Sequence, residues 1–160
     1  PRLLYAPESI AERVGELGAE LTEVLDDGAV IVGVLKGCLP FLADLVRCID
    51  RRIEIDFVAL SAFAPDSGRI RLTRDIAADV TDRQVVLVEG VVDTGFRVDF
   101  LRRHLVGHCT SEVRVCTLFD RSDRWSATDW TTRGSTGTCR VWWRWTSLPS
   151  RRNTVPVGRR

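Results

Sequence analysis

Residues 86–95 read VLVEGVVDTG, and this stretch decides the fold that we predict for the chain. It opens with an apolar, β-branched run over 85–88, which is typical of a strand buried on both faces. The rest of the stretch contains two carboxylates and two glycines, and helical spacing of apolar residues begins directly after it, at Phe96. A buried strand that passes through a glycine-containing loop into a helix indicates an α/β fold.

The same alternation of helix and strand continues on both sides of this stretch. The predicted helices span 7–25, 40–49 and 96–106, and the predicted strands span 29–35, 53–63, 85–88 and 112–119. Strands separated by helices of this length favour a parallel sheet with crossover connections. In such a sheet, ligands bind beyond the carboxyl ends of the strands.

One segment departs from the alternation of helices and strands. Residues 64–68 read APDSG, which is turn chemistry, and an alternating pattern resumes over 69–73. We therefore expect either a hairpin or a mobile loop between the predicted strand 53–63 and residue 73.

Composition places the chain among globular proteins. Its 160 residues fit one domain, with 44% hydrophobic and 28% charged residues. No apolar run approaches the roughly 18 residues of a membrane span, and no N-terminal stretch has the pattern of a signal peptide. The five cysteines include no C-x-x-C pair, so we expect reduced thiols in a cytoplasmic protein, with Cys48 and Cys116 in the core. We expect His104 and His108 to be surface residues and not ligands.

The composition changes abruptly near residue 121. Residues 1–121 hold 15 Lys and Arg against 20 Asp and Glu, whereas 122–160 hold 8 against 2, together with all five tryptophans. We expect an α/β domain over 1–121 and a divergent, poorly ordered basic tail of Trp, Arg, Ser and Thr over 122–160, which is not an independent domain. The tail is either a nucleic-acid-binding appendage or the translation of a shifted reading frame, and we favour the second.

Chemistry gathers in the loop between the central strand and its helix. Backbone N–H groups in a glycine-containing loop that opens a helix form a cradle for anions, reinforced by the helix dipole. Thr94 adds a hydroxyl donor, and Gly95 permits close approach of a phosphate. A carboxylate a few residues earlier, Glu89, suits a ligand with sugar hydroxyls beside its phosphate. The loop matches neither a Walker P-loop nor G-x-G-x-x-G.

These residues resemble the phosphoribosyl-pyrophosphate (PRPP) signature of the type I phosphoribosyltransferases, in which four apolar residues, two acidic positions and two apolar residues precede Asp-Thr-Gly. Two more segments, VGVLKG at 32–37 and FLADLVR at 41–47, resemble the pyrophosphate-binding loop and helix of the hypoxanthine-guanine enzymes. The resemblance covers residues 3–121. It implies a parallel sheet flanked by helices with a mobile hairpin loop, and a cytoplasmic homo-oligomer, a dimer or tetramer, with no role at membranes and no expected nucleic-acid partner.

The resemblance also implies a reaction and its residues. PRPP, with Mg²⁺, would donate its phosphoribosyl group to hypoxanthine or guanine, releasing pyrophosphate and forming IMP or GMP. The implied roles are proton exchange with the purine for Asp93 and metal binding for Glu89. PRPP binding, to the ribose or the phosphate, is implied for Glu89, Asp93, Thr94, Gly95, Phe96 and Arg97, pyrophosphate binding for Lys36 and Gly37, and purine binding for Arg121.

Several positions differ from the family pattern. Gly90 stands where a second acidic residue is implied, Arg97 where a hydroxyl is implied, and Ala62-Phe63 where a Ser-Tyr pair is implied. Arg121 replaces a lysine, and nothing in 122–160 resembles the closing segment of the family. The sequence therefore leaves open two other functions. One is a catalytically impaired homologue that still binds PRPP, a nucleotide or a partner subunit, and the less favoured one is nucleic-acid binding through the tail.

Overall fold

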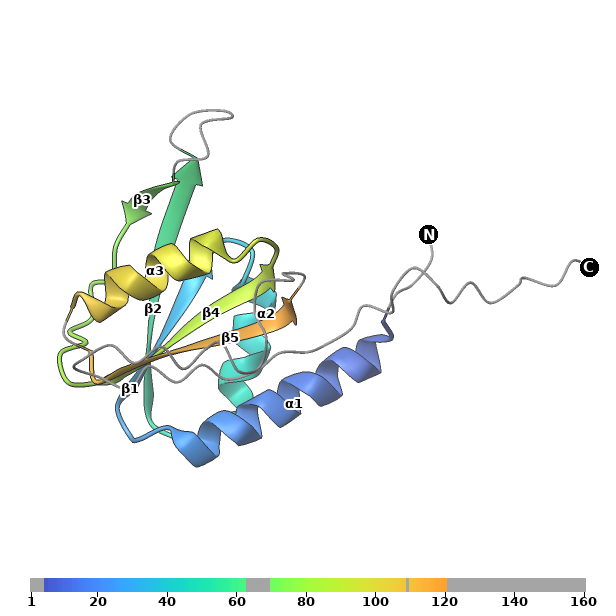
Figure 1. Ribbon diagram of the computed structural model, residues 1–160. Helices are drawn as coiled ribbons and strands as arrows, with labels where there is room; N and C mark the ends of the chain where they lie inside the picture. The colour runs from blue at the N-terminus through green and yellow to red at the C-terminus, as the bar shows by residue number, and fades with distance from the viewer. Residues whose placement is uncertain (1–4, 63–69, 109, 121–160) are drawn as a thin grey trace, which may run out of the picture.

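The computed structural model describes residues 5–62, 70–108 and 110–120, which form a five-stranded sheet with helices on both faces (Figure 1). The elements are α1 (Pro7–Val24), β1 (Ala29–Leu35), α2 (Leu39–Leu45), the 3-10 turn η1 (Val46–Cys48), β2 (Ile53–Ala62), β3 (Ile70–Arg74), β4 (Gln84–Val92), α3 (Phe96–Val106) and β5 (Glu112–Asp120). The predicted α/β fold is confirmed.

The strand order is β3-β2-β1-β4-β5. The β1 strand pairs in parallel with β2 and with β4, and β4 pairs in parallel with β5. Only β3 is antiparallel, because it returns along β2 as the second strand of a hairpin. The hairpin alternative is thus confirmed, whereas the tip of the hairpin, including Phe63, and the tail at 122–160 lie outside the described residues.

Alternation along the buried strands divides the core into two clusters. Ile31 of β1 packs with the apolar faces of α1 and α2, whereas its neighbours Val30 and Val32 pack with α3. Figure 1 shows the corresponding layers, with α1 and α2 on one side of the sheet and α3 on the other. The carboxyl end of β1 leads to α2, and the carboxyl end of β4 leads to α3. Because β1 and β4 are parallel neighbours, the two segments that follow them lie at the same edge of the sheet.

Two predicted boundaries were wrong. The β4 strand continues to Val92 instead of ending at Val88, because β5 pairs with it as far as Asp120. The second helix ends at Leu45 and passes into a 3-10 turn instead of reaching residue 49. The chain after this turn is held against α1, where the Thr22 hydroxyl accepts a hydrogen bond from the Asp50 backbone N–H at 2.9 Å. A helix that continued to residue 49 would not leave Asp50 in this position.

The two cysteines predicted to lie in the core differ. Cys116 is buried in β5, and burial raises the pKa of its thiol to about 12. The prediction for Cys48 was wrong, because its side chain is exposed at the end of η1. Its backbone nevertheless packs tightly on α1, where a Cβ atom on Gly18 would stand 2.7 Å from the Cys48 carbonyl oxygen.

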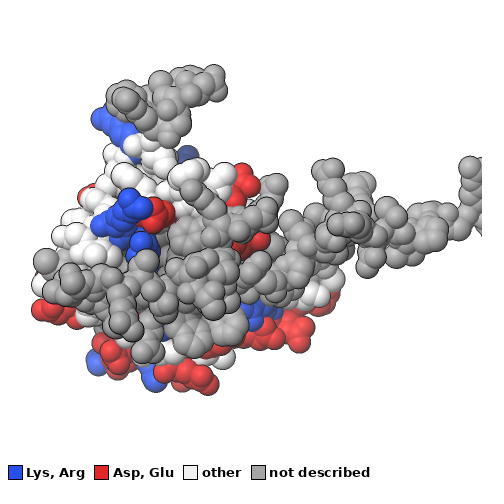
Figure 2. Space-filling model, in the orientation of Figure 1, with Lys and Arg blue, Asp and Glu red and all other residues white. Residues whose placement is uncertain are grey.

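The described surface carries both signs of charge. On the face seen in Figure 2, acidic and basic side chains of the described residues are interspersed. None of the helices in the described ranges is long and apolar enough to span a bilayer.

Candidate functional site

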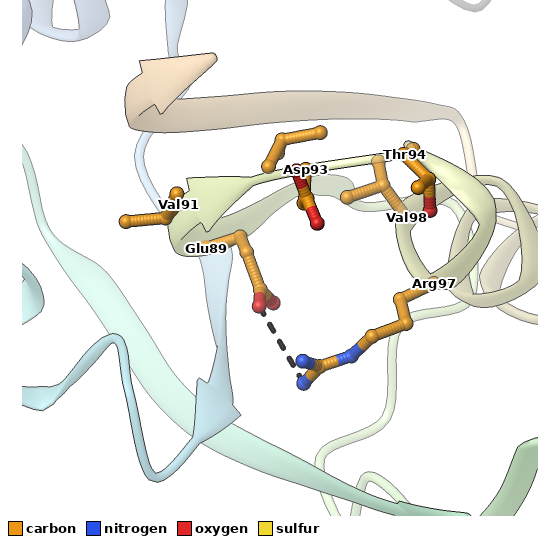
Figure 3. Close-up of a pocket in the computed structure, with 8 residues that line it drawn as sticks. Glu89, Val91, Asp93, Thr94, Arg97 and Val98 are labelled. Carbon is orange, nitrogen blue, oxygen red and sulfur yellow. Dashed lines mark ion pairs between the residues drawn. The ribbon is translucent and has the colours of Figure 1, made fainter. Parts of the chain in front are cut away.

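The segment that joins β4 to α3 lines a small depression at the carboxyl edge of the sheet (Figure 3). The lining residues are Glu89, Val91, Val92, Asp93, Thr94, Gly95, Arg97 and Val98. Because this segment follows the carboxyl end of β4, which lies between the parallel strands β1 and β5, the depression lies where open α/β folds bind their ligands. Five of the residues predicted for PRPP binding lie in its wall.

Gly95 sets the direction of the helix that follows. Its φ of 76° and ψ of −10° lie in the left-handed region, which glycine enters without the steric cost that a Cβ atom imposes. Its carbonyl oxygen accepts the first bond of α3, from Asp99 N–H at 2.9 Å. The preceding N–H groups at the start of α3 have no partner within the helix, so this end of α3 suits an anion.

The side chains around this helix start differ in exposure. Thr94 and Arg97 are exposed, so both can reach a ligand in the depression. The Phe96 side chain is 59% exposed, and its expected contribution to phosphate binding is through its backbone. Figure 3 shows the Asp93 carboxylate directed into the same space as Glu89 and Arg97.

Glu89 is the buried charge of the site. Its side chain is about 10% exposed and makes an ion pair of 3.5 Å between Oε1 and the Arg97 guanidinium (Figure 3). Burial raises the pKa of Glu89, and the charge of Arg97 only partly opposes this rise. The second oxygen, Oε2, is buried without a hydrogen-bond partner among the described residues. A buried carboxylate oxygen in this state can accept a ligand hydroxyl or bind a cation.

The loop that follows β1 meets this site from the other side. A Cβ atom on Gly90 would lie 3.0 Å from the carbonyl oxygen of Gly37, so the two backbones are in close contact. Lys36 and Gly37 are both exposed, and the peptide bond between Leu35 and Lys36 is cis. The structure thus brings the predicted pyrophosphate loop and the predicted PRPP loop together, although more than 50 residues separate them in sequence.

Some predicted site residues are not located, and others were missed. Arg121 lies outside the described residues. The strand prediction that stopped at residue 88 missed Val91, which is 49% exposed at the site. Continuing the apolar pattern to Val92 would have found it. Cys38 follows the Lys36-Gly37 loop but does not line the depression; burial and the nearby charge of Glu89 raise the pKa of its thiol.

Together these groups can bind an anion beside a polyol. The helix start and Thr94 provide donors for a phosphate, while Glu89 and Asp93 provide acceptors for hydroxyl groups. Lys36 adds a flexible cation within the adjoining loop.

Comparison with known proteins agrees with this chemistry. The phosphoribosyl transferase domain model matches residues 6–142, a range that passes the composition break at 121. The hypoxanthine-guanine phosphoribosyltransferase of Streptococcus mutans is 36% identical over 126 residues, which are 76% of this chain and 70% of that protein. The enzyme of the same name from Bacillus subtilis is 34% identical over 124 residues, 75% of this chain and 69% of that protein.

A solved structure supports the same conclusion. The crystal structure of a hypoxanthine-guanine phosphoribosyltransferase from Bacillus anthracis superposes with a TM-score of 0.73 at 29% identity, covering 81% of this chain and 80% of that chain. Site geometry, family match and relatives therefore agree: the chain belongs to the phosphoribosyltransferase family, and the relatives it resembles are hypoxanthine-guanine phosphoribosyltransferases.

Proposed function

We propose that the protein transfers the 5-phosphoribosyl group of PRPP to a 6-oxopurine, hypoxanthine or guanine, and releases pyrophosphate. The observation that carries this proposal is the contact between the Lys36-Gly37 loop and Gly90 of β4. PRPP has a phosphate at one end of its ribose and a pyrophosphate at the anomeric carbon. A site for it needs two anion-binding loops on either side of hydroxyl acceptors, and these two loops supply them.

The roles that we propose combine the family resemblance with the positions of the residues. The start of α3, from Thr94 to Arg97, holds the 5′-phosphate, and Glu89 accepts the ribose hydroxyls. The loop of Lys36 and Gly37 holds the pyrophosphate as its bond to the anomeric carbon breaks and the bond to the purine nitrogen forms, giving IMP or GMP. Asp93 exchanges a proton with the purine N7. Catalysis of this kind rests on positioning and on neutralising charge at the separating groups, so small displacements are costly.

Mg²⁺ fits the residues at this site. The Glu89 Oε2 atom is buried without a hydrogen-bond partner among the described residues, and carboxylate oxygens are the ligands that Mg²⁺ prefers. We propose that Glu89 binds the ribose hydroxyls directly or through this ion, which it would then hold. When bound, the ion would neutralise negative charge on the phosphates of PRPP.

A second candidate function is PRPP binding without efficient turnover. It is favoured by Gly90, which lacks the second carboxylate that the family resemblance implies and lies against the Gly37 carbonyl group. Under this alternative the protein would bind PRPP or a nucleotide, or a partner subunit, with little product formed.

We further propose that the protein acts in the cytoplasm as a homo-oligomer. Sedimentation of the purified chain would test the oligomeric state.

The test of the main proposal is an assay of the purified chain with PRPP, Mg²⁺ and hypoxanthine or guanine, with Asp93→Asn as the matched variant. The proposal expects IMP or GMP formation that falls by about 100-fold or more in the variant, since general acid–base catalysis contributes roughly 10²–10⁴-fold. PRPP binding by calorimetry without turnover would establish the second function instead. A chain that forms no product and binds neither PRPP, nor a nucleotide, nor a partner subunit would refute both.

A further inference from the structure

A cluster of three ligating side chains lies outside the candidate active site. The Nε2 atom of His104 lies 2.8 Å from each carboxylate oxygen of Asp75 and 3.3 Å from the Nε2 atom of His108. One ligating atom from each of the three residues lies within 4.8 Å of the others. The cluster is at the C-terminal end of α3, whereas the candidate active site is at its N-terminal end.

The fold brings these residues together from two distant segments. His104 is in the last turn of α3, and Gly107 continues right-handed helical geometry with φ −63° and ψ −17°. His108 therefore follows His104 by one turn on the same face, the spacing at which two histidines can share a cation. Asp75 directly follows β3, and Figure 1 shows the connection from β3 to β4 passing this end of α3.

The carboxylate partner is held in place independently of the histidines. The segment after Asp75 is tied to β2, since Asp56 Oδ2 accepts hydrogen bonds from Ala77 N–H at 2.5 Å and Ala78 N–H at 2.8 Å. The His104 and Asp75 side chains are 28% and 41% exposed. The three ligating atoms are thus fixed close together and are still open to solvent ions.

Protons satisfy only part of this arrangement, because a proton on His104 Nε2 can be donated to Asp75 while the exposed His108 nitrogen is left to solvent. When Nε2 of a neutral His104 carries the proton, it donates to Asp75 and offers no lone pair to His108. When His104 Nε2 carries no proton, its lone pair faces the lone pairs of the Asp75 carboxylate. A cation at the centre of the cluster would accept lone pairs from all three residues at once, as His and carboxylate ligands do with zinc.

The spacing also fits such an ion. In tetrahedral coordination with zinc–nitrogen bonds of about 2.0–2.1 Å, two ligating nitrogens lie about 3.3–3.4 Å apart. The two Nε2 atoms are 3.3 Å apart in the structure. The Asp75 oxygens lie 2.8 Å from His104 Nε2, a hydrogen-bonding distance, so they must move away by about half an ångström to share the ion. Imidazole and carboxylate together select borderline cations such as Zn²⁺ over Mg²⁺ or Ca²⁺, which prefer oxygen ligands alone.

We propose that Asp75, His104 and His108 form a binding site for a divalent cation of the zinc type, with a fourth position open to water. The bound ion clamps the β3–β4 connection to the end of α3. It is separate from the Mg²⁺ expected at Glu89 and does not depend on the transferase activity of the protein.

The experiment measures Zn²⁺ binding to the full chain by calorimetry, together with the melting temperature with and without Zn²⁺. Those two histidines are the only ones in the chain, so Co²⁺ in place of Zn²⁺ reports imidazole ligation from this site alone. His108→Gln removes one exposed ligand, and Asp75→Asn tests the carboxylate. We expect each change to weaken Zn²⁺ binding by at least about 10-fold. Loss of a residue that only hydrogen-bonds to a metal ligand already weakens metal binding by about 10-fold or more, and these residues are the ligands themselves. Zn²⁺ should also raise the melting temperature of the parent and not that of His108→Gln.

Two control variants separate this site from other sources of zinc affinity. Cys48→Ser removes an exposed thiol, and Asp93→Asn removes a carboxylate of the candidate active site; both should retain the Zn²⁺ affinity of the parent. Binding that survives in His108→Gln, or that is lost in Cys48→Ser or Asp93→Asn alone, would overturn the proposal. A failure of purine transfer in the parent would leave these expected results unchanged.

Discussion

The carbonyl oxygen of Gly37 lies 3.0 Å from the point at which a Cβ atom on Gly90 would stand. Such an approach is closer than side chains normally make to a backbone oxygen, so the absence of a side chain at Gly90 and the position of the Gly37 loop depend on each other. Glu89, in contrast, pairs with Arg97 at the start of α3. Two consecutive positions of β4 thus serve different walls of the site, one of them through a backbone contact.

This contact determines what is expected of Gly90→Asp. The carboxylate restores a hydroxyl acceptor, but its Cβ atom must displace the Gly37 loop by a few tenths of an ångström. Gly90→Ala introduces the same Cβ atom without the carboxylate, so it is the matched control. A hydrogen bond to a charged acceptor contributes about 1.5–3 kcal/mol, so Gly90→Asp should bind PRPP about 10- to 150-fold more tightly than Gly90→Ala in calorimetry with Mg²⁺. Equal affinities would show that position 90 does not face the ribose.

Glu89→Gln should make the protein more stable and less able to bind PRPP. Burial raises the pKa of Glu89, so the folded state disfavours its charged form. The charged form of Glu89 therefore destabilises the folded protein. This destabilisation is absent at pH values below the pKa of glutamate in the unfolded chain, and it grows as the pH rises through the raised pKa of Glu89 in the folded protein. We therefore expect a higher melting temperature for the variant near pH 7, a difference that disappears in acid, and PRPP binding about 10- to 150-fold weaker. A variant that is less stable than its parent near pH 7 would contradict this account of Glu89.

Lys36→Ala should weaken binding of pyrophosphate and PRPP and leave the fold intact, because the side chain is exposed in the loop after β1. Loss of an interaction with a charged partner corresponds to about a 10- to 150-fold change in affinity. Arg47→Ala, at another exposed cation, controls for the change in net charge. Calorimetry with pyrophosphate alone isolates this loop. Equal effects of the two changes would reduce Lys36 to general surface charge.

Asp56→Asn should destabilise the protein without directly altering the site. Although burial by itself raises the pKa of Asp56, the backbone N–H groups of Ala78, Phe57 and Ala77 outweigh it and hold the pKa below its usual range. An amide nitrogen at either oxygen position would face one of these donors, which costs at least about 1.5–3 kcal/mol in the free energy of unfolding.

The stability that Asp56→Asn loses depends on pH, because the pKa of Asp56 is lowered in the folded protein. The stabilisation by Asp56 is complete above the unfolded aspartate pKa and is lost as pH falls through the lower folded pKa. Urea unfolding near pH 7 should therefore separate variant from parent, and the difference should narrow in acid. Asp44→Asn, at an exposed ion pair with Arg47, is the control and should stay within about 0.5 kcal/mol of the parent.

The fold could be predicted from local pattern because the apolar period distinguishes strand from helix. Val85 to Val88 and Ala29 to Leu35 lack polar residues, so they form the buried centre of a parallel sheet, as predicted. Boundaries were less accurate where long-range pairing decided them. The pairing of Val92 with Asp120 lengthens β4, and the contact of Asp50 with Thr22 accompanies the early end of the second helix.

The sequence by itself determined the turn at residues 93–95 and the helix that starts at Phe96, on which the proposed phosphate binding rests, because a glycine that accepts positive φ and a helix start are local properties of the chain. Only the tertiary structure decided which side chains meet. The contact of Gly37 with Gly90 and the convergence of Asp75 with His104 join residues that are 53 and 29 positions apart. No local pattern records such pairs, since their distance depends on the order of strands in the sheet and on how each helix packs against it.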